Sequence, residues 1–175
     1  MTLESTLTLP NSSVKLPVLG FGVWESRGDT CVKSCKTALE NGYRHIDTAQ
    51  VYGNESQVGE ALRQSGVKRS DVFITSKILS PGSTDEQTYE KIAESVKKID
   101  DRSDGYVDLM LIHNANVGAE AREKMWKAME KALKEGITKA IGVSNYGGWH
   151  IDGMKKYATT WPPHVNQIEV CFTRL

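Results

Sequence analysis

Short apolar runs alternate along the chain with longer segments whose apolar residues recur at helical spacing. Six of the short runs predict strands, at residues 19–24, 45–49, 72–78, 107–113, 140–145 and 165–170. Most are continuously apolar rather than alternating, which is typical of parallel strands that are covered on both faces. Ahead of them, residues 6–18 contain a turn signal near Asn11, Ser12 and Ser13, and this pattern predicts a small β-hairpin.

Helical spacing predicts five helices between the strands, at residues 30–40, 56–64, 84–100, 120–135 and 149–157. The helix at 84–100 begins with Thr84 and Gln87, the pair of residues that forms a capping box. The helix at 120–135 stops before Gly136, because glycine readily adopts the left-handed conformation that ends helices. Their apolar stripes predict faces that pack on the core: Ile92, Val96 and Ile99 in one helix, and Trp126, Met129 and Leu133 in the other.

The repeated order of strand and helix predicts an α/β fold with a parallel sheet, since right-handed crossovers join successive parallel strands. Two architectures fit that order: an open doubly wound sheet and a (β/α)₈ barrel of the TIM type. An open dinucleotide-binding sheet would carry G-x-G-x-x-G after its first strand, but here Gly20-Phe21-Gly22 is not followed by the third glycine. We therefore predict one domain over residues 1–175, an incomplete barrel with about six of the eight βα units, which ends after the sixth strand.

The composition is that of a soluble globular domain, with 39% hydrophobic and 25% charged residues. Lysine plus arginine and aspartate plus glutamate both number 22, and the sequence has no basic stripe, so we expect no nucleic-acid partner. The N-terminal residues do not match a signal peptide, and no apolar run approaches the roughly 18 residues of a membrane span. We therefore expect a cytoplasmic protein with no membrane partner.

Cysteine is sparse, with three residues in the chain. Cys31 and Cys35 lie four positions apart on one face of a predicted helix, and we favour a reduced structural pair over a redox or metal-binding pair. His45, His150 and His164 have no partners at a spacing that suggests a metal site. We therefore expect no metal.

Polar side chains stand where the predicted strands end. Asp47 and Tyr52 follow the second strand, Lys77 lies near the end of the third, and His113 ends the fourth. In a TIM-type barrel the active site lies at the carboxyl ends of the strands, so these four side chains would meet there. Each alone is an ordinary strand-end or loop residue, but their joint placement on successive units predicts an active site.

The four residue types suit acid–base chemistry. A free tyrosine has a pKa near 10, and exchange of its proton at neutral pH requires stabilisation of the phenolate by about three pKa units, or roughly 4 kcal/mol. An ammonium about 4 Å away supplies roughly that energy, so Lys77 could lower the pKa of Tyr52. Asp47 would keep a buried Lys77 charged, and His113 would donate a hydrogen bond that orients a substrate carbonyl.

Six stretches of the sequence carry a resemblance to a known family. They are LGFGVW at 19–24, GYRHIDTAQVYGNESQVGEAL at 42–62, VFITSKI at 72–78, VDLMLIH at 107–113, GITKAIGVSNY at 136–146 and VNQIEV at 165–170. With these motifs in this order, the chain resembles the aldo-keto reductase superfamily. The resemblance covers nearly the whole sequence, and its second stretch is highly specific to the family.

The resemblance implies an NADPH-dependent oxidoreductase that reduces aldehydes or ketones to alcohols on a (β/α)₈ barrel. Asp47, Tyr52, Lys77 and His113 match the family's catalytic tetrad, in which Tyr52 would donate the proton. Hydride would pass from the nicotinamide to the carbonyl carbon of a small-molecule substrate, without a metal or a covalent intermediate.

The same resemblance implies the binding residues. Ser144, Asn145 and Gln167 would bond to the nicotinamide carboxamide. Val23 matches a position whose backbone lies near the cofactor, and the aspartate of the tetrad is expected to contribute there too. Trp24 matches an aromatic wall of the substrate pocket, which it would share with the tyrosine and histidine of the tetrad.

Relatives in this family usually continue beyond the position of Val170 with two further βα units. That part carries the aromatic residue that stacks on the nicotinamide and the basic residues that bind the 2′-phosphate of NADPH, so we expect weak or absent activity from residues 1–175 alone. The segment after His113 lacks a proline that often follows in relatives. Two alternatives remain, a non-catalytic member that binds NADP(H) or another protein, and a truncated gene model. The sequence predicts no oligomeric state.

Overall fold

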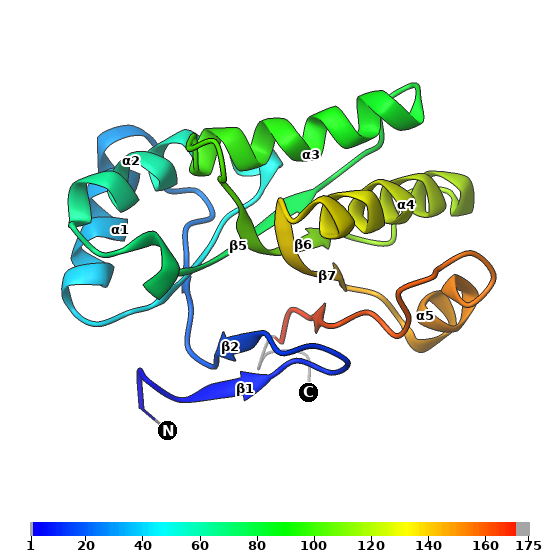
Figure 1. Ribbon diagram of the computed structural model, residues 1–175, viewed down its shortest axis with the longest axis horizontal. Helices are drawn as coiled ribbons and strands as arrows, with labels where there is room; N and C mark the ends of the chain where they lie inside the picture. Colours follow the sequence, from blue (N-terminus) through cyan, green and yellow to red (C-terminus); the bar gives the residue numbers. More distant parts are fainter. Residues whose placement is uncertain (1, 171–175) are drawn as a thin grey trace.

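The computed structural model describes residues 2–170, which form a parallel sheet covered by helices and a separate hairpin (Figure 1). The hairpin strands are β1 (Thr6–Thr8) and β2 (Lys15–Pro17). The sheet strands are β3 (Phe21–Gly22), β4 (His45–Asp47), β5 (Phe73–Ile78), β6 (Val107–Ile112), β7 (Thr138–Ser144) and β8 (Asn166–Gln167). The helices are α1 (Gly28–Glu40), α2 (Glu55–Ser65), α3 (Asp85–Ile99), α4 (Ala119–Glu135) and α5 (Gly148–Met154), with 3₁₀ turns at Gln50–Tyr52 and Arg69–Asp71.

The six sheet strands neighbour one another in chain order, and every neighbouring pair is parallel. A helix separates each strand from the next, which confirms the predicted βα repeat. Figure 1 shows α1, α2, α3 and α4 along one side of the sheet and the β1–β2 hairpin on the other. The architecture is an incomplete TIM-type barrel with an N-terminal hairpin, as the sequence predicts. Within residues 2–170, β3 and β8 each pair with one strand.

The ends of the elements follow local chemistry. The capping box of α3 is confirmed, since the Gln87 N–H donates to Thr84 Oγ1 at 3.1 Å and the Thr84 N–H donates to Gln87 Oε1 at 3.3 Å. The end of α4 is also confirmed, because Gly136 adopts the left-handed conformation with φ of 80°. The outermost sheet strands β3 and β8 are shorter than predicted, since each forms ladder hydrogen bonds on one side only, and α5 ends at Met154, before residue 157.

Successive residues of β5 and β6 face opposite sides of the sheet, as the pleat requires. One side packs on the helices, in a core that includes Ile74, Ile78, Met110 and Ile112. The other side is the interior of the curved sheet, where Phe73, Leu109, Leu111 and Ala140 pack with Leu9 of the hairpin. Lys77 pairs in register with Leu111 and therefore faces the interior, while its neighbour Ser76 faces the helices.

A partly buried ionic network ties the strands together at their amino ends. Arg69 Nη2 donates to Asp108 Oδ2 at 2.9 Å and to the Tyr106 carbonyl at 2.8 Å. The same Asp108 oxygen accepts the N–H of Ile74 at 2.9 Å. These bonds join the 3₁₀ turn to β5 and β6 at the end of the sheet opposite to Lys77.

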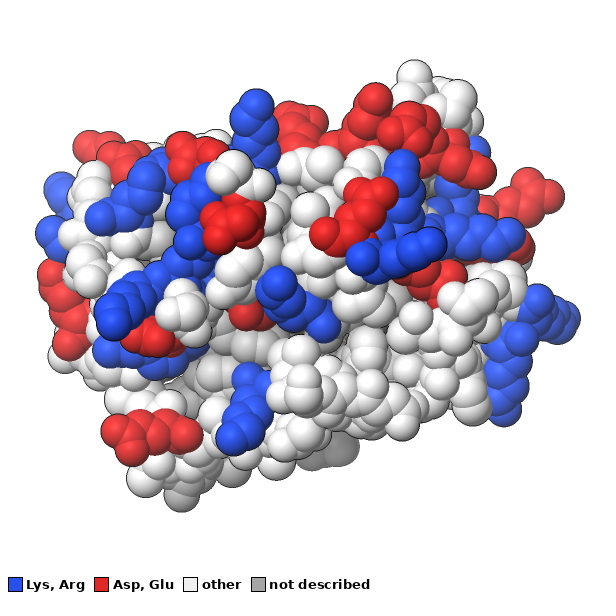
Figure 2. Space-filling model, viewed as in Figure 1, with Lys and Arg blue, Asp and Glu red and all other residues white. Residues whose placement is uncertain are grey.

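The outer surface carries both signs of charge. Figure 2 shows lysine and arginine side chains interspersed with aspartate and glutamate side chains over the helical side. Between residues 2 and 170, the helices are too short or too polar to span a bilayer.

The buried indole of Trp126 tests the core between α4 and the sheet. Trp126 is fully buried, whereas Trp149 on α5 is 70% exposed. We predict that Trp126→Ala lowers the free energy of unfolding by about 3 to 5 kcal/mol, because it removes apolar contacts and leaves a cavity. The control Trp149→Ala should change it by less than about 1 kcal/mol. Urea denaturation followed by circular dichroism measures both, and equal losses would contradict the described core.

Candidate active site

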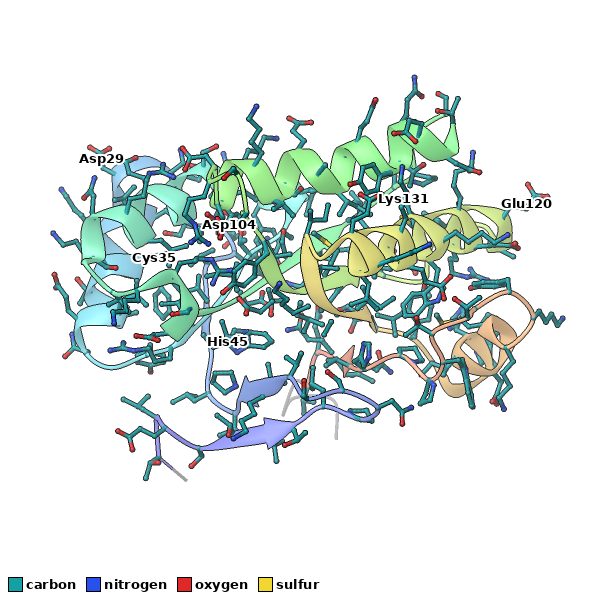
Figure 3. The ribbon with its side chains drawn as sticks, in the orientation of Figure 1. Asp29, Cys35, His45, Asp104, Glu120 and Lys131 are labelled. Carbon is teal, nitrogen blue, oxygen red and sulfur yellow. The ribbon has the colours of Figure 1, made fainter. Side chains whose placement is uncertain are left out.

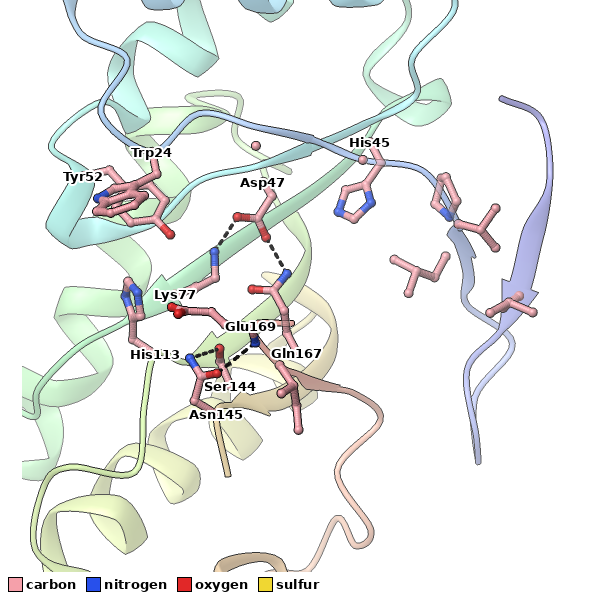
Figure 4. Close-up of a pocket in the computed structure, with 17 residues that line it drawn as sticks. Trp24, His45, Asp47, Tyr52, Lys77, His113, Ser144, Asn145, Gln167 and Glu169 are labelled. Carbon is pink, nitrogen blue, oxygen red and sulfur yellow. Dashed lines mark hydrogen bonds and ion pairs between the residues drawn. The ribbon is translucent and has the colours of Figure 1, made fainter. Parts of the chain in front are cut away.

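A cavity of about 690 Å³ opens at the carboxyl ends of the sheet strands (Figure 4). The predicted site residues, Val23 excepted, line it together, and they come from the six sheet strands and the loops that follow: Trp24, Asp47, Tyr52, Lys77, His113, Ser144, Asn145 and Gln167. The sheet thus brings to one cavity residues that lie up to 143 positions apart in the sequence, from Trp24 to Gln167.

A buried ion pair forms the floor of the cavity. Lys77 is 2% exposed, and its Nζ lies 2.5 Å from Asp47 Oδ1. The same ammonium donates to the Thr48 carbonyl at 3.1 Å. The other carboxylate oxygen of Asp47 accepts a hydrogen bond from Gln167 Nε2 at 2.9 Å. Asp47 therefore supplies the counter-charge that a buried lysine needs, as we expected.

Tyr52 and His113 face this ion pair. The Lys77 ammonium lies 5.1 Å from the centre of the Tyr52 ring, and the rings of Tyr52 and His113 meet edge to face at 5.6 Å. Tyr52 ends a 3₁₀ turn, and Gly53 then adopts the left-handed conformation with φ of 67°. Figure 4 shows the two rings and the ammonium around one space. The predicted juxtaposition of residues 52 and 77 is thus present.

The electrostatics of Tyr52 differ from our expectation. Burial, together with the negative charges of Asp47 and Glu169, raises the pKa of Tyr52 to about 12. The expectation that Lys77 makes Tyr52 acidic is therefore wrong for this structure, because burial and the negative charges of Asp47 and Glu169 all disfavour the phenolate. Tyr52 keeps its proton at neutral pH.

His113 is neutral at the same pH. Burial lowers its pKa below the ordinary 6.5, and the positive charge of Lys77 lowers it further. The main-chain N–H of His113 donates to the Ile78 carbonyl at 2.9 Å, and this bond fixes the end of β6 beside β5. Its buried Nδ1 has no hydrogen-bond partner within residues 2–170.

Glu169 is a site residue that the sequence reasoning missed. It lines the cavity, and its charge acts on the pKa of both Tyr52 and His113. Its main-chain N–H donates to Asn145 Oδ1 at 3.1 Å. The available signal was the alternation of the strand, since Glu169 stands two residues after Gln167 and shares its face.

Ser144, Asn145 and Gln167 form a cluster of hydroxyl and amide groups beside the ion pair. Asn145 Nδ2 donates to Ser144 Oγ at 3.3 Å, and the Asn145 main-chain N–H donates to the Gln167 carbonyl at 2.8 Å. Asn145 adopts the left-handed conformation with φ of 56°, which turns the chain at the end of β7. Donors and acceptors of this kind fit a carboxamide, and so they fit the expected nicotinamide.

The two residues after β3 differ in role. Trp24 is 71% exposed and forms a wall at the mouth of the cavity. Val23 is buried in the core and does not line the cavity, while its main-chain N–H donates to the Asp47 carbonyl at 3.1 Å. Its expected nearness to a cofactor stays a prediction.

The remaining histidines and cysteines belong to the packed interior or the surface, and His45 also lines the cavity. His45 lies between the sheet and the hairpin and shares a hydrogen bond with Thr75 Oγ1 at 2.9 Å (Figure 3). Cys31 and Cys35 are fully buried with free thiols, and a hydrogen bond from Cys35 lowers the pKa of Cys31 to about 7. Cys171 lies outside the described residues. In the part of the chain described, no three His, Cys, Asp or Glu side chains are grouped to hold a metal.

Comparison with known proteins agrees with this geometry. A sequence profile of the Aldo/keto reductase family matches residues 18–175. The chain is 39% identical over 170 residues to the glyoxal reductase of Bacillus subtilis, and the alignment covers 96% of this chain and 59% of that protein. It is 42% identical over 132 residues to the methylglyoxal reductase DkgB of Salmonella typhimurium, and this alignment covers 75% of this chain and 48% of that protein.

Solved structures give the same result. An aldo/keto reductase from Brucella melitensis superposes with a TM-score of 0.85 at 38% identity, over 95% of this chain and 63% of that one. The Bombyx mori aldo-keto reductase in complex with NADP superposes with a TM-score of 0.81 at 29% identity, over 95% of this chain and 58% of that one. The chain thus spans less than two thirds of these relatives. With the profile match, the sequence identities and the superpositions in agreement, the chain belongs to the aldo/keto reductase family.

Proposed function

We propose that the cavity reduces an aldehyde or ketone to an alcohol with NADPH, and that Tyr52 donates the proton. The observation that carries the proposal is the Asp47–Lys77 ion pair with Tyr52 and His113 around the same cavity. Relatives with reductase names support the reaction class. The names glyoxal reductase and methylglyoxal reductase make small dicarbonyl aldehydes the first substrates to test.

NADPH is the proposed cofactor, and the NADP complex of the Bombyx mori relative supports it. When bound, its nicotinamide supplies hydride to the carbonyl carbon. Ser144, Asn145 and Gln167 would hold the carboxamide through their hydroxyl and amide groups. Since Gln167 Nε2 already bonds to Asp47, its carbonyl oxygen is the atom left to accept from a ligand amide.

The proton comes from Tyr52 in this proposal. Hydride addition turns the carbonyl oxygen into an alkoxide, whose conjugate acid is about as weak as water, with a pKa near 15.7. A phenol with a pKa of about 12 still transfers its proton to that oxygen favourably, by roughly 5 kcal/mol. The raised pKa of Tyr52 therefore keeps the donor protonated before the reaction and leaves enough driving force during it.

His113 and the ion pair orient the reacting groups. The neutral His113 imidazole donates one hydrogen bond, and donation to the substrate oxygen would hold that oxygen toward the Tyr52 hydroxyl. Lys77, fixed by Asp47 and the Thr48 carbonyl, holds its ammonium 5.1 Å from the centre of the Tyr52 ring. Trp24 limits the cavity on the substrate side.

Replacement of Tyr52 by phenylalanine is the central test. We predict that Tyr52→Phe lowers kcat for methylglyoxal reduction by about 10²- to 10⁴-fold, because the proton donor is lost while the ring stays. NADPH affinity, measured by titration of nicotinamide fluorescence, should stay within about twofold of the wild type, since the proposed carboxamide ligands are intact. Unchanged kcat would rule out Tyr52 as the donor, and NADPH binding without any turnover by the wild type would favour the non-catalytic alternative.

The pH profile tests the high pKa of Tyr52. Because the donor is protonated below about pH 12 and His113 is neutral above about 6.5, kcat/KM for reduction should stay level from about pH 7 to 10. A phenol made acidic near neutrality would instead give a tenfold loss for each pH unit above its pKa. Steady-state rates of NADPH consumption across that range distinguish the two, and an early alkaline loss that Tyr52→Phe abolishes would contradict the raised pKa.

The ion pair makes a prediction for stability. Asp47→Asn leaves the buried Lys77 without its counter-charge and should lower the free energy of unfolding by about 2 to 4 kcal/mol. The double variant Asp47→Asn/Lys77→Met removes the buried charge, so it should regain most of that stability while it stays inactive. Urea denaturation and NADPH consumption measure the two effects. Full stability of Asp47→Asn alone would show that Lys77 does not depend on this carboxylate.

A further inference from the structure

Asn54 is a buried residue close to Tyr52 whose side chain is fully committed to neighbouring loops. It is 1% exposed and precedes α2, in the position where asparagine usually caps a helix, but its side chain makes no cap hydrogen bond. Instead, Nδ2 donates to the Val23 carbonyl at 2.8 Å and to the Ser26 carbonyl at 2.9 Å. The amide thus gives up a local contact for two contacts in the loop between β3 and α1.

Thr48 connects the same side chain to the ion pair. The fully buried Thr48 hydroxyl donates to Asn54 Oδ1 at 2.6 Å, while the Thr48 carbonyl accepts from Lys77 Nζ at 3.1 Å. A continuous series of hydrogen bonds therefore runs from Lys77 through Thr48 and Asn54 to the loop after β3. Buried networks of this kind cost little only when every member is bonded, and all these groups are bonded.

The two ends of the Tyr52 loop meet at this contact. Thr48 follows β4, Asn54 precedes α2, and the 3₁₀ turn that ends at Tyr52 lies between them. The side-chain bond between Thr48 and Asn54 therefore closes the loop that carries the proposed donor.

Asn54 also holds the β3–α1 loop, which carries the Trp24 wall of the cavity. The two carbonyls that Asn54 holds flank Trp24 and Glu25, and Glu25 has a φ of 63°. A non-glycine residue in the left-handed region is strained, so this turn depends on the contacts around it. Asn54 supplies two of them.

We propose that Asn54 is a positioning residue that sets two distances at once, from the Tyr52 hydroxyl to Lys77 and from the Trp24 wall to the reacting groups. The inference rests on the proposed reduction at this cavity for its kinetic consequence. The structural consequence is independent of that reaction: Asn54 holds the Tyr52 loop and the Trp24 loop as one unit. Asn54 acts through these loops and does not line the cavity.

Matched substitutions at Thr48 isolate the link to the donor. Thr48→Val keeps the shape and removes the hydroxyl, whereas Thr48→Ser keeps the hydroxyl. We expect Thr48→Val to lower kcat by about 10- to 100-fold with KM changed by less than about threefold, because misplacement of a catalytic group by about 1 Å has effects of that size. Thr48→Ser should stay within about threefold of the wild type in both constants.

Substitution of Asn54 tests the second link. Asn54→Asp keeps the oxygen that accepts from Thr48 but sets a carboxylate oxygen against the Val23 and Ser26 carbonyls. The Trp24 loop should move, so KM should rise by about tenfold in addition to the loss in kcat. Asp108→Asn is the control for lost stability, since it weakens the partly buried network at the amino ends of the strands. It should lower the urea midpoint and leave kcat and KM unchanged.

Amide hydrogen exchange measures how firmly the Tyr52 and Trp24 loops are held, and it does not require enzymatic activity. The N–H groups of Val23 and Ser26 in one loop, and of Tyr52 and Gly53 in the other, are hydrogen bonded and give protected amides. Asn54→Asp should speed exchange in both loops, and Thr48→Val should speed it in the Tyr52 loop, in each case more than Asp108→Asn does. If the wild type is inactive but the variants show these increases in exchange, the proposed function is wrong and the structural role of Asn54 is supported. Two results would contradict the role of Asn54. One is equal kinetics for Thr48→Val and Thr48→Ser, and the other is exchange in Asn54→Asp and Thr48→Val that is no faster than in Asp108→Asn.

Discussion

The ion pair between Asp47 and Lys77 is the interaction on which the rest of the site depends. Lys77 stands inside the curved sheet because the alternation of β5 turns Ser76 toward the helices. The third partner, Gln167, belongs to β8, which three strands separate from β4 in the sheet. A hydrogen bond across that span forms only because the sheet curls, so the curvature of the barrel and the charge balance of the cavity sustain each other.

This pair also determines the character of the phenol above it. A lone ammonium would acidify Tyr52, but the Asp47 carboxylate 2.5 Å from that ammonium acts in the opposite direction, and burial is the largest cause of the raised pKa. The result is a donor that stays protonated, beside a histidine that stays neutral. Both states suit delivery of a proton to a strongly basic oxygen better than its removal from an alcohol.

Periodicity and strand-end chemistry were enough to predict much of this from the sequence. The apolar runs of β5, β6 and β7, the capping box at Thr84 and the meeting of Asp47, Tyr52, Lys77 and His113 all follow from local rules applied to a parallel sheet. The contacts of Asn54 did not, because they depend on which groups lie opposite in space. The pKa of Tyr52 was predicted with the wrong sign, since it is a balance between burial and several charges whose distances no sequence pattern encodes.

Asn145 shows how conformation and chemistry can select the same residue. Glycine would adopt its left-handed backbone without strain, but it would lose the oxygen that holds the Glu169 N–H and the amide that reaches Ser144. Aspartate would keep the turn and the acceptor while it discards the donor, and a branched residue would fail on the backbone alone. Asparagine meets both demands, so evolutionary tolerance at this position should be narrow for two separate reasons, and a substitution found there in a homologue would signal a changed turn as much as a changed ligand.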